Sequence, residues 1–276
     1  MVVTTIYVVR HAIRATYTVD PETGKYHSQV PIPTGLDGDV PLAAKGVAQA
    51  KELAIALTSL PISRYYSSPF YRCLQTIAPF ATSTSHNVRV DPGIGEWYGR
   101  ARFSHPIPAS ISTLKPFFPF IDDDYPPTII PCHNGETVDE MHDRVAFALT
   151  TILAREDLAA EAEDSGQGGR AILIATHAAS MIAIGRTLTG RMPADVAEDD
   201  FQTFTAGMSR FVRKEVPKES KVELETWDPA PGTPKVDWRD GKGIAGGWEC
   251  VVNSDCSYLT GGAERGWSLA EAQTFV

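Results

Sequence analysis

The chain has 276 residues, of which 21% are charged, and its formal net charge is −9. This composition is typical of a globular protein with a sizeable core, and the acidity argues against nucleic acid as a direct partner, because phosphate backbones bind to basic faces. The first residues lack the basic region of a signal peptide, and no apolar run is long enough to cross a bilayer, so we expect a soluble protein of the cytoplasm or nucleus.

The amino-terminal part predicts a strand, a long loop and a helix. Thr5–Val9 is a β-branched and aromatic run of the kind found in buried strands. Ala15–Asp39 contains several prolines and glycines and predicts a loop. Ala43–Leu57 has one apolar face and therefore predicts an amphipathic helix.

The next part repeats this order and then becomes irregular. Arg64–Ser67 predicts a strand, a helix is expected to begin at Ser68 and Pro69, and Val88–Val90 predicts a third strand. Residues 97–134 then carry seven prolines and four phenylalanines. Such a long aromatic segment predicts a cap over a functional site.

The second half returns to alternating elements. Helices are predicted for Thr137–Leu153 and Ser180–Leu188, and the acidic segment Ala159–Gly169 predicts a connector. Ala171–His177 (AILIATH) is the clearest strand pattern in the chain. The late strands are expected at Met208–Val212 and Val222–Trp227. The alternation predicts an α/β fold, a three-layer α/β/α sandwich with a mostly parallel sheet and a cap insertion.

Two of the predicted strands end in histidine. His11 follows the first strand in VVRHA, and His177 follows the clearest strand in IATHA. Ligands in sheets of this kind bind beyond the carboxyl ends of the strands, so both histidines fall where a site is expected. Taken singly, each would more often be a structural residue.

Arginines and a carboxylate complete this candidate site. The sequence offers Arg10, Arg14 and Arg72 as cations, and Glu96 as an acid. Guanidinium groups bind phosphate in a bidentate manner, and helix amino termini add oriented N–H groups. A neutral histidine can attack phosphorus while a carboxylic acid protonates the leaving oxygen, so the set predicts phosphoryl chemistry.

Four motifs in this order resemble the histidine phosphatase superfamily, the phosphoglycerate mutase-like clan. They are RHAIR, DVPLAAKGVAQA, SSPFYRCLQTI and IATHAASM, and NGETVDEMHDRV also resembles a helix start of the family. The resemblance covers Ile6 to Leu188. It implies that His11 is the nucleophile that becomes phosphohistidine and that Glu96 is the general acid. It also implies that Arg10, Arg14, Arg72 and His177 bind the substrate phosphate, with no cofactor and no metal.

A metal site is the rival interpretation of part of this set. His11, Glu96 and His177 are suitable ligand types for a metal ion. The arginines would remain unexplained, because cations repel a metal, so phosphate is favoured.

The sequence also departs from the pattern of the family. Ala12 and Ala178 stand where the family has glycine, and a methyl group there could distort the pocket. The segment EWYG lacks an arginine that the mutases carry, which argues against phosphoglycerate mutase-type transfer. Arg14 gives RHAIR a likeness to the Arg-His-Gly-x-Arg form of the phosphatase branches. Together with the aromatic cap, this resemblance favours hydrolysis of aryl or phosphotyrosine-like esters. The alternative is a weakly active or inactive interaction subunit that kept the fold.

The carboxy-terminal part is not a motif of the broad family. We expect a phosphatase domain over residues 1–227 and a Gly/Pro-rich extension over residues 228–276, which packs on the domain or on a protein partner. The extension resembles that of fungal members, including subunits of transcription factor IIIC. Cys250 and Cys256 could form a bridge, but free thiols in a reducing compartment are favoured.

Overall fold

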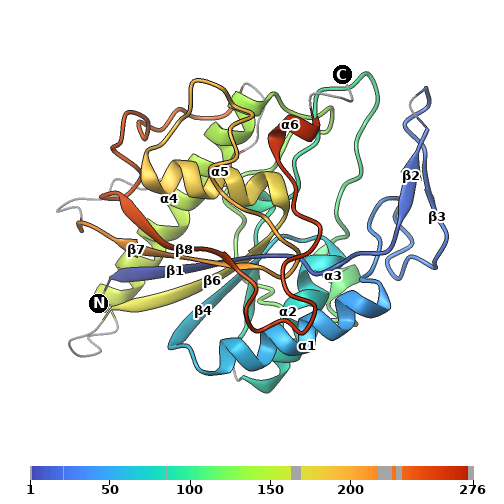
Figure 1. Cartoon of the computed structure of the whole chain (residues 1–276), viewed down its shortest axis with the longest axis horizontal. Coiled ribbons are helices and arrows are strands. Elements are labelled where there is room, and N and C mark those ends of the chain that lie inside the picture. Colours follow the sequence, from blue (N-terminus) through green and yellow to red (C-terminus); the bar gives the residue numbers. More distant parts are fainter. Residues whose placement is uncertain are drawn as a thin grey trace.

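The computed structural model describes residues 2–20, 22–84, 86–162, 169–216, 226–227 and 232–272. Its centre is a six-stranded sheet in the order β5-β4-β6-β1-β7-β8 (Figure 1). In that order the strands are Val88–Val90, Ile62–Ser67, Arg170–Thr176, Val3–Arg10, Met208–Arg213 and Trp248–Asp255. The first four are mutually parallel, whereas β7 and β8 are antiparallel to their neighbours. The predicted α/β fold with a mostly parallel sheet is confirmed.

Helices cover both faces of the sheet. On one face α1 (Ala44–Thr58) packs against α2 (Tyr71–Ser83), and on the other α4 (Val138–Ala162) packs against α5 (Ala178–Thr189). Every residue of the central strand β6 is buried, as expected for a parallel strand covered on both faces. The carboxyl ends of β1 and β6 therefore lie side by side.

Helix boundaries differ from the prediction most clearly in three places. Helix α2 begins at Tyr71, after the expected start at Ser68 and Pro69, because Phe70 still has the extended backbone of an N-cap residue. Helix α5 begins at Ala178, two residues before the expected start, because His177 already has the extended backbone of an N-cap residue. Helix α4 continues to Ala162 and takes in part of the expected connector. The remainder of that connector, residues 163–168, lies outside the described residues.

The expected loop Ala15–Asp39 contains a short hairpin. Strands β2 (Tyr17–Val19) and β3 (Tyr26–Ser28) pair in an antiparallel ladder that is separate from the main sheet. Gly24 has a φ of +69°, which glycine adopts without steric cost, and its Cα lies against the ring of Phe103 in the cap segment. The hairpin and the cap segment are therefore in contact.

The cap segment itself is mostly irregular. Between Trp97 and Asn134 the structure has one helix, α3 (Ile111–Leu114), among its described residues. The side chains of Leu114, Phe118 and Ile121 are buried against the core on the α1 and α2 face. The 3-10 turn η1 (Pro92–Ile94) precedes the segment.

The extension lies on the sheet and on the helices of one face. Strand β8 forms the edge of the sheet, and Trp238 and Trp248 are fully buried. The backbone N–H of Ile244 donates to the carbonyl of Thr187 at 3.0 Å. Of the expected strand Val222–Trp227, residues 222–225 lie outside the described residues, and Trp227 forms an isolated bridge with Ile129.

All four cysteines are free thiols. None of the helices searched among the described residues has the length and apolar character needed to span a bilayer.

Candidate active site

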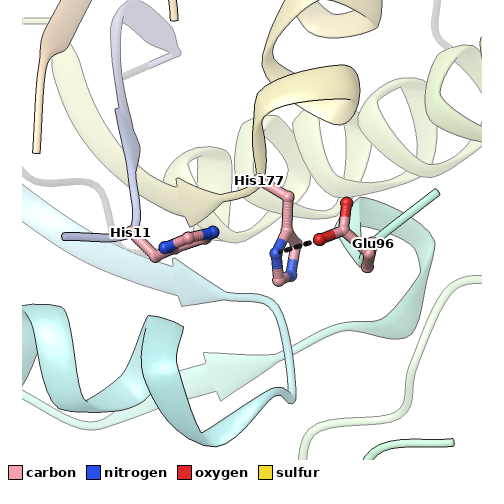
Figure 2. Close-up of side chains that lie close together, drawn as sticks. All are labelled: His11, Glu96 and His177. Carbon is pink, nitrogen blue, oxygen red and sulfur yellow. Dashed lines mark ion pairs between the residues drawn. The ribbon is translucent and has the colours of Figure 1, made fainter. Parts of the chain in front are cut away.

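The two strand-end histidines meet beyond the carboxyl end of the sheet. The backbone N–H of His11 donates to the carbonyl of Thr176 at 2.9 Å, which fixes His11 beside the neighbouring strand. The ring centroids of His11 and His177 are 5.3 Å apart, and the two planes meet at 64°. Figure 2 shows both rings and the carboxylate of Glu96 beyond His177. The structure thus brings together three predicted site residues that are far apart in sequence.

Helices α1 and α2 hold the turn that follows His11. The N–H of Ala12 donates to Thr76 Oγ1 at 2.9 Å, and the N–H of Ile13 donates to Gln49 Oε1 at 3.0 Å. Gly46 lies so close that a Cβ on it would be 2.0 Å from the carbonyl oxygen of Ile13. The spacing of Gly46 and Gln49 in KGVAQA therefore has a structural reason, because both contact the same turn.

The tautomer of His11 follows from its neighbour. Nδ1 lies 2.8 Å from the carbonyl oxygen of Ala12, and since a carbonyl only accepts, Nδ1 carries the proton. Nε2 is then left with its lone pair. Burial lowers the pKa of His11 well below its usual value, and the nearby Arg72, His177 and Arg10 lower it further. The ring is therefore a neutral imidazole near pH 7.

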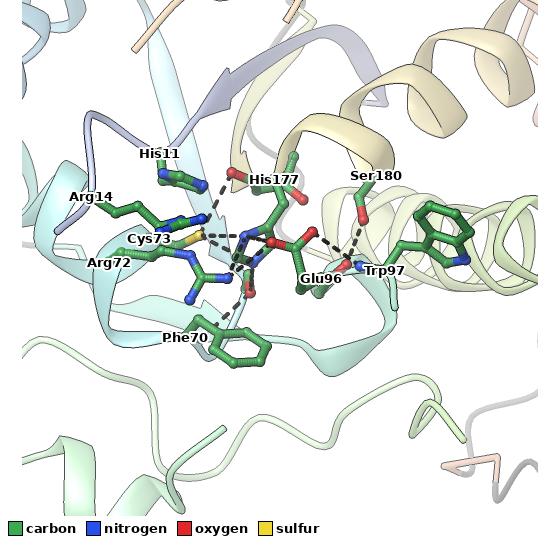
Figure 3. A network of polar contacts seen from close by, with 12 residues as sticks. His11, Arg14, Phe70, Arg72, Cys73, Glu96, Trp97, His177 and Ser180 are labelled. Carbon is green, nitrogen blue, oxygen red and sulfur yellow. Dashed lines mark hydrogen bonds and ion pairs between the residues drawn. The ribbon is translucent and has the colours of Figure 1, made fainter. Parts of the chain in front are cut away.

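Arg72, Glu96 and His177 form one polar cluster (Figure 3). Arg72 Nη2 donates to Glu96 Oε2 at 3.0 Å and lies 3.2 Å from His177 Nδ1. His177 Nδ1 is 3.1 Å from Glu96 Oε2. A protonated Nδ1 donates to the carboxylate and a deprotonated Nδ1 accepts from the guanidinium. His177 Nδ1 can therefore form a hydrogen bond within the cluster whether or not it carries a proton.

The side chain of Arg72 is fully buried, and some of its hydrogen-bond donors are unpaired in the described part of the chain. Its Nε and Nη1 have no hydrogen-bond partner among the described residues. Its guanidinium carbon lies 4.5 Å from the ring centroid of Phe70, which covers one face of the group. A buried cation with two free donors is unfavourable unless an acceptor is present, so this edge of Arg72 is suited to an oxyanion.

The other two arginines lie near this edge. Burial is the main cause that lowers the pKa of Arg10 to about 10, and the attraction of Glu96 opposes it. Repulsion from Arg14 and Arg72 lowers this pKa further. Arg10 Nε is buried and also has no partner among the described residues. Arg14 donates to the carbonyl of Ala15 at 3.0 Å, with its guanidinium 4.0 Å from the ring centroid of Tyr17. The predicted cations thus converge on one region.

Glu96 is positioned by hydrogen bonds to the backbone that leads to it. The carbonyl of Gly93 accepts from Arg144 Nη1 at 2.8 Å, that of Ile94 accepts from Thr176 Oγ1 at 2.6 Å, and that of Gly95 accepts from Ser180 Oγ. Arg144 is held in turn by a buried ion pair with Glu136 at 2.8 Å. The motif NGETVDEMHDR thus orients the loop that carries Glu96.

Burial and neighbouring groups compete in setting the pKa values of Glu96 and His177. Burial raises the pKa of Glu96, but His177 and the Arg72 guanidinium outweigh it, and the pKa lies well below its usual value. Burial lowers the pKa of His177 to about 4, against the attraction of Glu96 and with the help of Arg72. Without a bound anion, Glu96 is thus a carboxylate and His177 a neutral ring near pH 7.

The alanines that replace the family glycines cause no backbone strain. Neither Ala12 nor Ala178 has a positive φ, and both side chains are buried. The expected distortion of the pocket by a methyl group at a special backbone angle therefore does not arise here, because the backbone is ordinary at both positions.

The rival metal site has suitable spacing but unsuitable charge. Single ligand atoms of His11, Glu96 and His177 lie within 4.8 Å of one another. Arg72 Nη2, however, lies within hydrogen-bond distance of both Glu96 and His177. A guanidinium in that position repels a cation, so the residues present fit an anion better than a metal ion.

Sequence reasoning missed two buried neighbours of His177. Ser68 Oγ lies 2.7 Å from His177 Nε2, and Cys73 Sγ lies 3.4 Å from the same atom. Burial raises the pKa of the Cys73 thiol to about 12, which makes it a poor nucleophile. The signal for Ser68 was its place at the start of the predicted helix, where a hydroxyl is common, and that pattern does not point to a histidine in another strand.

Comparisons with known proteins agree with this arrangement. The profile of the histidine phosphatase superfamily (branch 1) matches residues 6–222. The transcription factor tau 55 kDa subunit of Saccharomyces cerevisiae is 34% identical over 277 residues, which cover 98% of this chain and 59% of that protein. The ecdysteroid-phosphate phosphatase of Drosophila melanogaster is 26% identical over 173 residues, 60% of this chain and 22% of that protein.

A solved structure shares the fold. The ecdysone phosphate phosphatase of Bombyx mori, in complex with tungstate, has a TM-score of 0.55 and 18% identity, with 83% of this chain and 99% of that chain covered. Because the profile matches most of the chain, from before the first strand-end histidine to beyond the second, the chain belongs to the histidine phosphatase superfamily, branch 1.

Proposed function

We propose that the chain is a phosphomonoester hydrolase that acts through a phosphohistidine on His11. The observation that carries the proposal is the pairing of a neutral His11, whose Nε2 has a free lone pair, with a buried Arg72 that has two donors without partners among the described residues. Such an arrangement favours an in-line attack on a phosphorus atom whose oxygens are held by cations.

The first step transfers the phosphoryl group to His11. The bond between His11 Nε2 and phosphorus forms while the ester P–O bond breaks, and the leaving oxygen takes a proton from Glu96. Glu96 is a carboxylate in the empty site. A bound phosphate brings negative charge to the carboxyl and competes for Arg72, and both effects raise the carboxyl pKa toward the range of a general acid.

The second step releases phosphate. Water gives a proton to Glu96 and attacks phosphorus, the P–N bond breaks, and His11 regains its lone pair. His177 Nδ1, 3.1 Å from Glu96 Oε2, holds the carboxyl in place during both steps. Arg10, Arg14 and Arg72 stabilise the charge on the transferred group, which is the main source of rate enhancement in phosphoryl transfer.

Aromatic side chains near the cluster support an aryl or phosphotyrosine-like substrate. Phe70 lies 5.4 Å from the ring of His177 and 6.3 Å from Tyr98, and Tyr98 stacks on His105 at 4.8 Å. Tyr17 carries the Arg14 guanidinium on its face. A flat leaving group gains more from such neighbours than a small, charged glycerate does.

A second candidate function is that of a subunit in a transcription complex in the nucleus, with little or no activity. The observation that favours it is the 34% identity over 98% of the chain to the yeast transcription factor subunit. The extension would then provide a surface for a protein partner. The two functions are compatible, because an enzyme can also be a subunit.

His11→Ala tests the nucleophile. We expect the variant to lose hydrolysis of p-nitrophenyl phosphate by roughly 10³-fold or more and to form no acid-labile phosphoenzyme, because the proposed attacking nitrogen is removed. His133→Ala, in the exposed part of the cap, is the matched control. A chelator should leave the hydrolysis rates of the wild type and of His133→Ala unchanged.

Full turnover in His11→Ala would reject the scheme. An inactive wild type that still folds would favour the second candidate function over hydrolysis.

The choice of substrate tests the leaving-group proposal. We expect kcat/KM for phosphotyrosine or p-nitrophenyl phosphate to exceed that for 3-phosphoglycerate by about tenfold or more, since stacking is worth about 1 kcal/mol or more per aromatic contact. Phosphate release assays on the same preparation measure both rates. Faster turnover of the glycerate would contradict the proposal.

Protonation of His11 can be followed by NMR. Because the pKa of His11 is lowered, its ring should stay neutral from pH 7.5 down to pH 6, with the proton on Nδ1. Ring nitrogen shifts, assigned by comparison with His11→Ala, report this state. A His11 ring that is already charged at pH 7 would be incompatible with a neutral nucleophile.

A further inference from the structure

We propose that a segment of the extension, residues 256–267, positions Arg10 for phosphate binding, with Arg265 as the positioning residue. We call this segment the strap. The inference rests on the proposed function, because it assigns a role to Arg10 in holding a phosphoryl group. It adds a part of the chain that lies outside the matched family profile, which ends at residue 222.

Two backbone carbonyls hold the guanidinium of Arg10. Arg10 Nη1 donates to the carbonyl of Thr203 and, at 2.6 Å, to the carbonyl of Arg265. Arg10 Nε is buried and without a partner among the described residues. Because the guanidinium is planar, fixing one of its nitrogens on two carbonyls also sets the direction of its remaining donors.

The strap is attached at both sides of Arg265. The carbonyl of Glu264 accepts from the N–H of Thr205 at 3.0 Å, and the carbonyl of Trp267 accepts from Thr203 Oγ1 at 2.7 Å. Glu264 also forms an ion pair with Lys45 of α1. The Arg265 carbonyl therefore has little freedom to leave Arg10.

A second attachment joins the strap to α1 and to the loop before β7. Thr260 donates to Glu52 from its N–H at 3.1 Å and from its hydroxyl at 2.6 Å. The hydroxyl of Tyr258 donates to the carbonyl of Ala206. The N–H of Ala206 in turn reaches the carbonyl of His11 at 3.4 Å. The strap thus contacts the loop that supports both Arg10 and the proposed nucleophile.

The backbone at Arg265 is unusual in a way that favours this role. Its φ is +48°, in the left-handed region that a non-glycine residue rarely adopts. Its side chain is exposed, so the conformation is held by the backbone contacts of the strap rather than by packing of the guanidinium. Strained backbone of this kind persists where the surrounding structure fixes it, often next to functional groups.

A matched pair of variants separates positioning from folding. Proline cannot adopt a φ of +48°, so Arg265→Pro should turn its carbonyl away from Arg10. Arg265→Gly allows the same φ and keeps the carbonyl in place. Both variants lose the same exposed guanidinium, and no hydrogen bond from the Arg265 N–H is found among the described residues. The experiment compares them in the full chain.

We expect the inhibition constant of inorganic phosphate to be about tenfold higher or more in Arg265→Pro than in Arg265→Gly, since a hydrogen bond to a charged group is lost. The ratio kcat/KM for p-nitrophenyl phosphate should fall by a similar factor, mainly through KM. The melting temperature of Arg265→Pro should be lower than that of Arg265→Gly, because proline cannot adopt the native φ, so the inhibition constant of the folded protein is the deciding measurement. Equal inhibition constants in the two variants would overturn the proposal, whatever their stabilities.

Thr203→Val provides a second test should Arg265→Pro fail to fold. Valine keeps the volume of the buried threonine but removes the hydroxyl that ties Trp267 to the loop. The inhibition constant should rise by a smaller factor, and an unchanged constant would contradict the role of the strap. Failure of the proposed function is distinguishable, because it would leave the wild type without turnover. Phosphate binding measured by calorimetry would then still compare the variants.

Discussion

The structure depends on one constraint: a guanidinium, that of Arg72, lies fully buried at the carboxyl end of the sheet. Taking a cation out of water costs several kcal/mol unless partners replace the lost hydration. Glu96 and His177 occupy one edge of Arg72, and the ring of Phe70 covers a face. The remaining donors have no partner among the described residues. We therefore propose that a bound anion accepts hydrogen bonds from these donors, and the other parts of the site are consistent with that role.

In the proposed mechanism, a bound anion changes the protonation of Glu96, a neighbour of Arg72, in the direction that catalysis requires. Burial, helped by the nearby Arg72 and Arg10, lowers the pKa of His11 and keeps its ring neutral, and the hydrogen bond to the Ala12 carbonyl selects the tautomer with a lone pair on Nε2. His177 and Arg72 lower the pKa of Glu96 against the effect of burial and keep it ionised in the empty site. Negative charge from a substrate acts on Glu96 in the opposite sense and raises its pKa. In the proposed mechanism, substrate binding thus raises the pKa of Glu96 toward that of a general acid, while His11 is already neutral before the substrate binds.

Much of this arrangement could be predicted from local patterns. The two strand-end histidines and the helix predicted to begin at Ser68 and Pro69 place His11, His177 and Arg72 at the carboxyl ends of parallel strands. The hairpin β2–β3 could not be predicted, because its strands are only three residues long and proline and glycine dominate that segment. The contact of Arg10 with Arg265 spans 255 positions, and no periodicity of the sequence encodes a bond between a side chain and so distant a carbonyl. No sequence pattern therefore indicated that the extension contacts Arg10.

A crystal structure of the full chain with tungstate bound would test the central claim most directly. We expect the oxyanion to lie against Arg72 Nε and Nη1 and Arg10 Nε, with its central atom in line with His11 Nε2. Glu96 should then be on the side opposite the nucleophile. Tungstate bound elsewhere, with Arg72 still unpaired at that edge, would contradict the anion site and the chemistry that we derive from it.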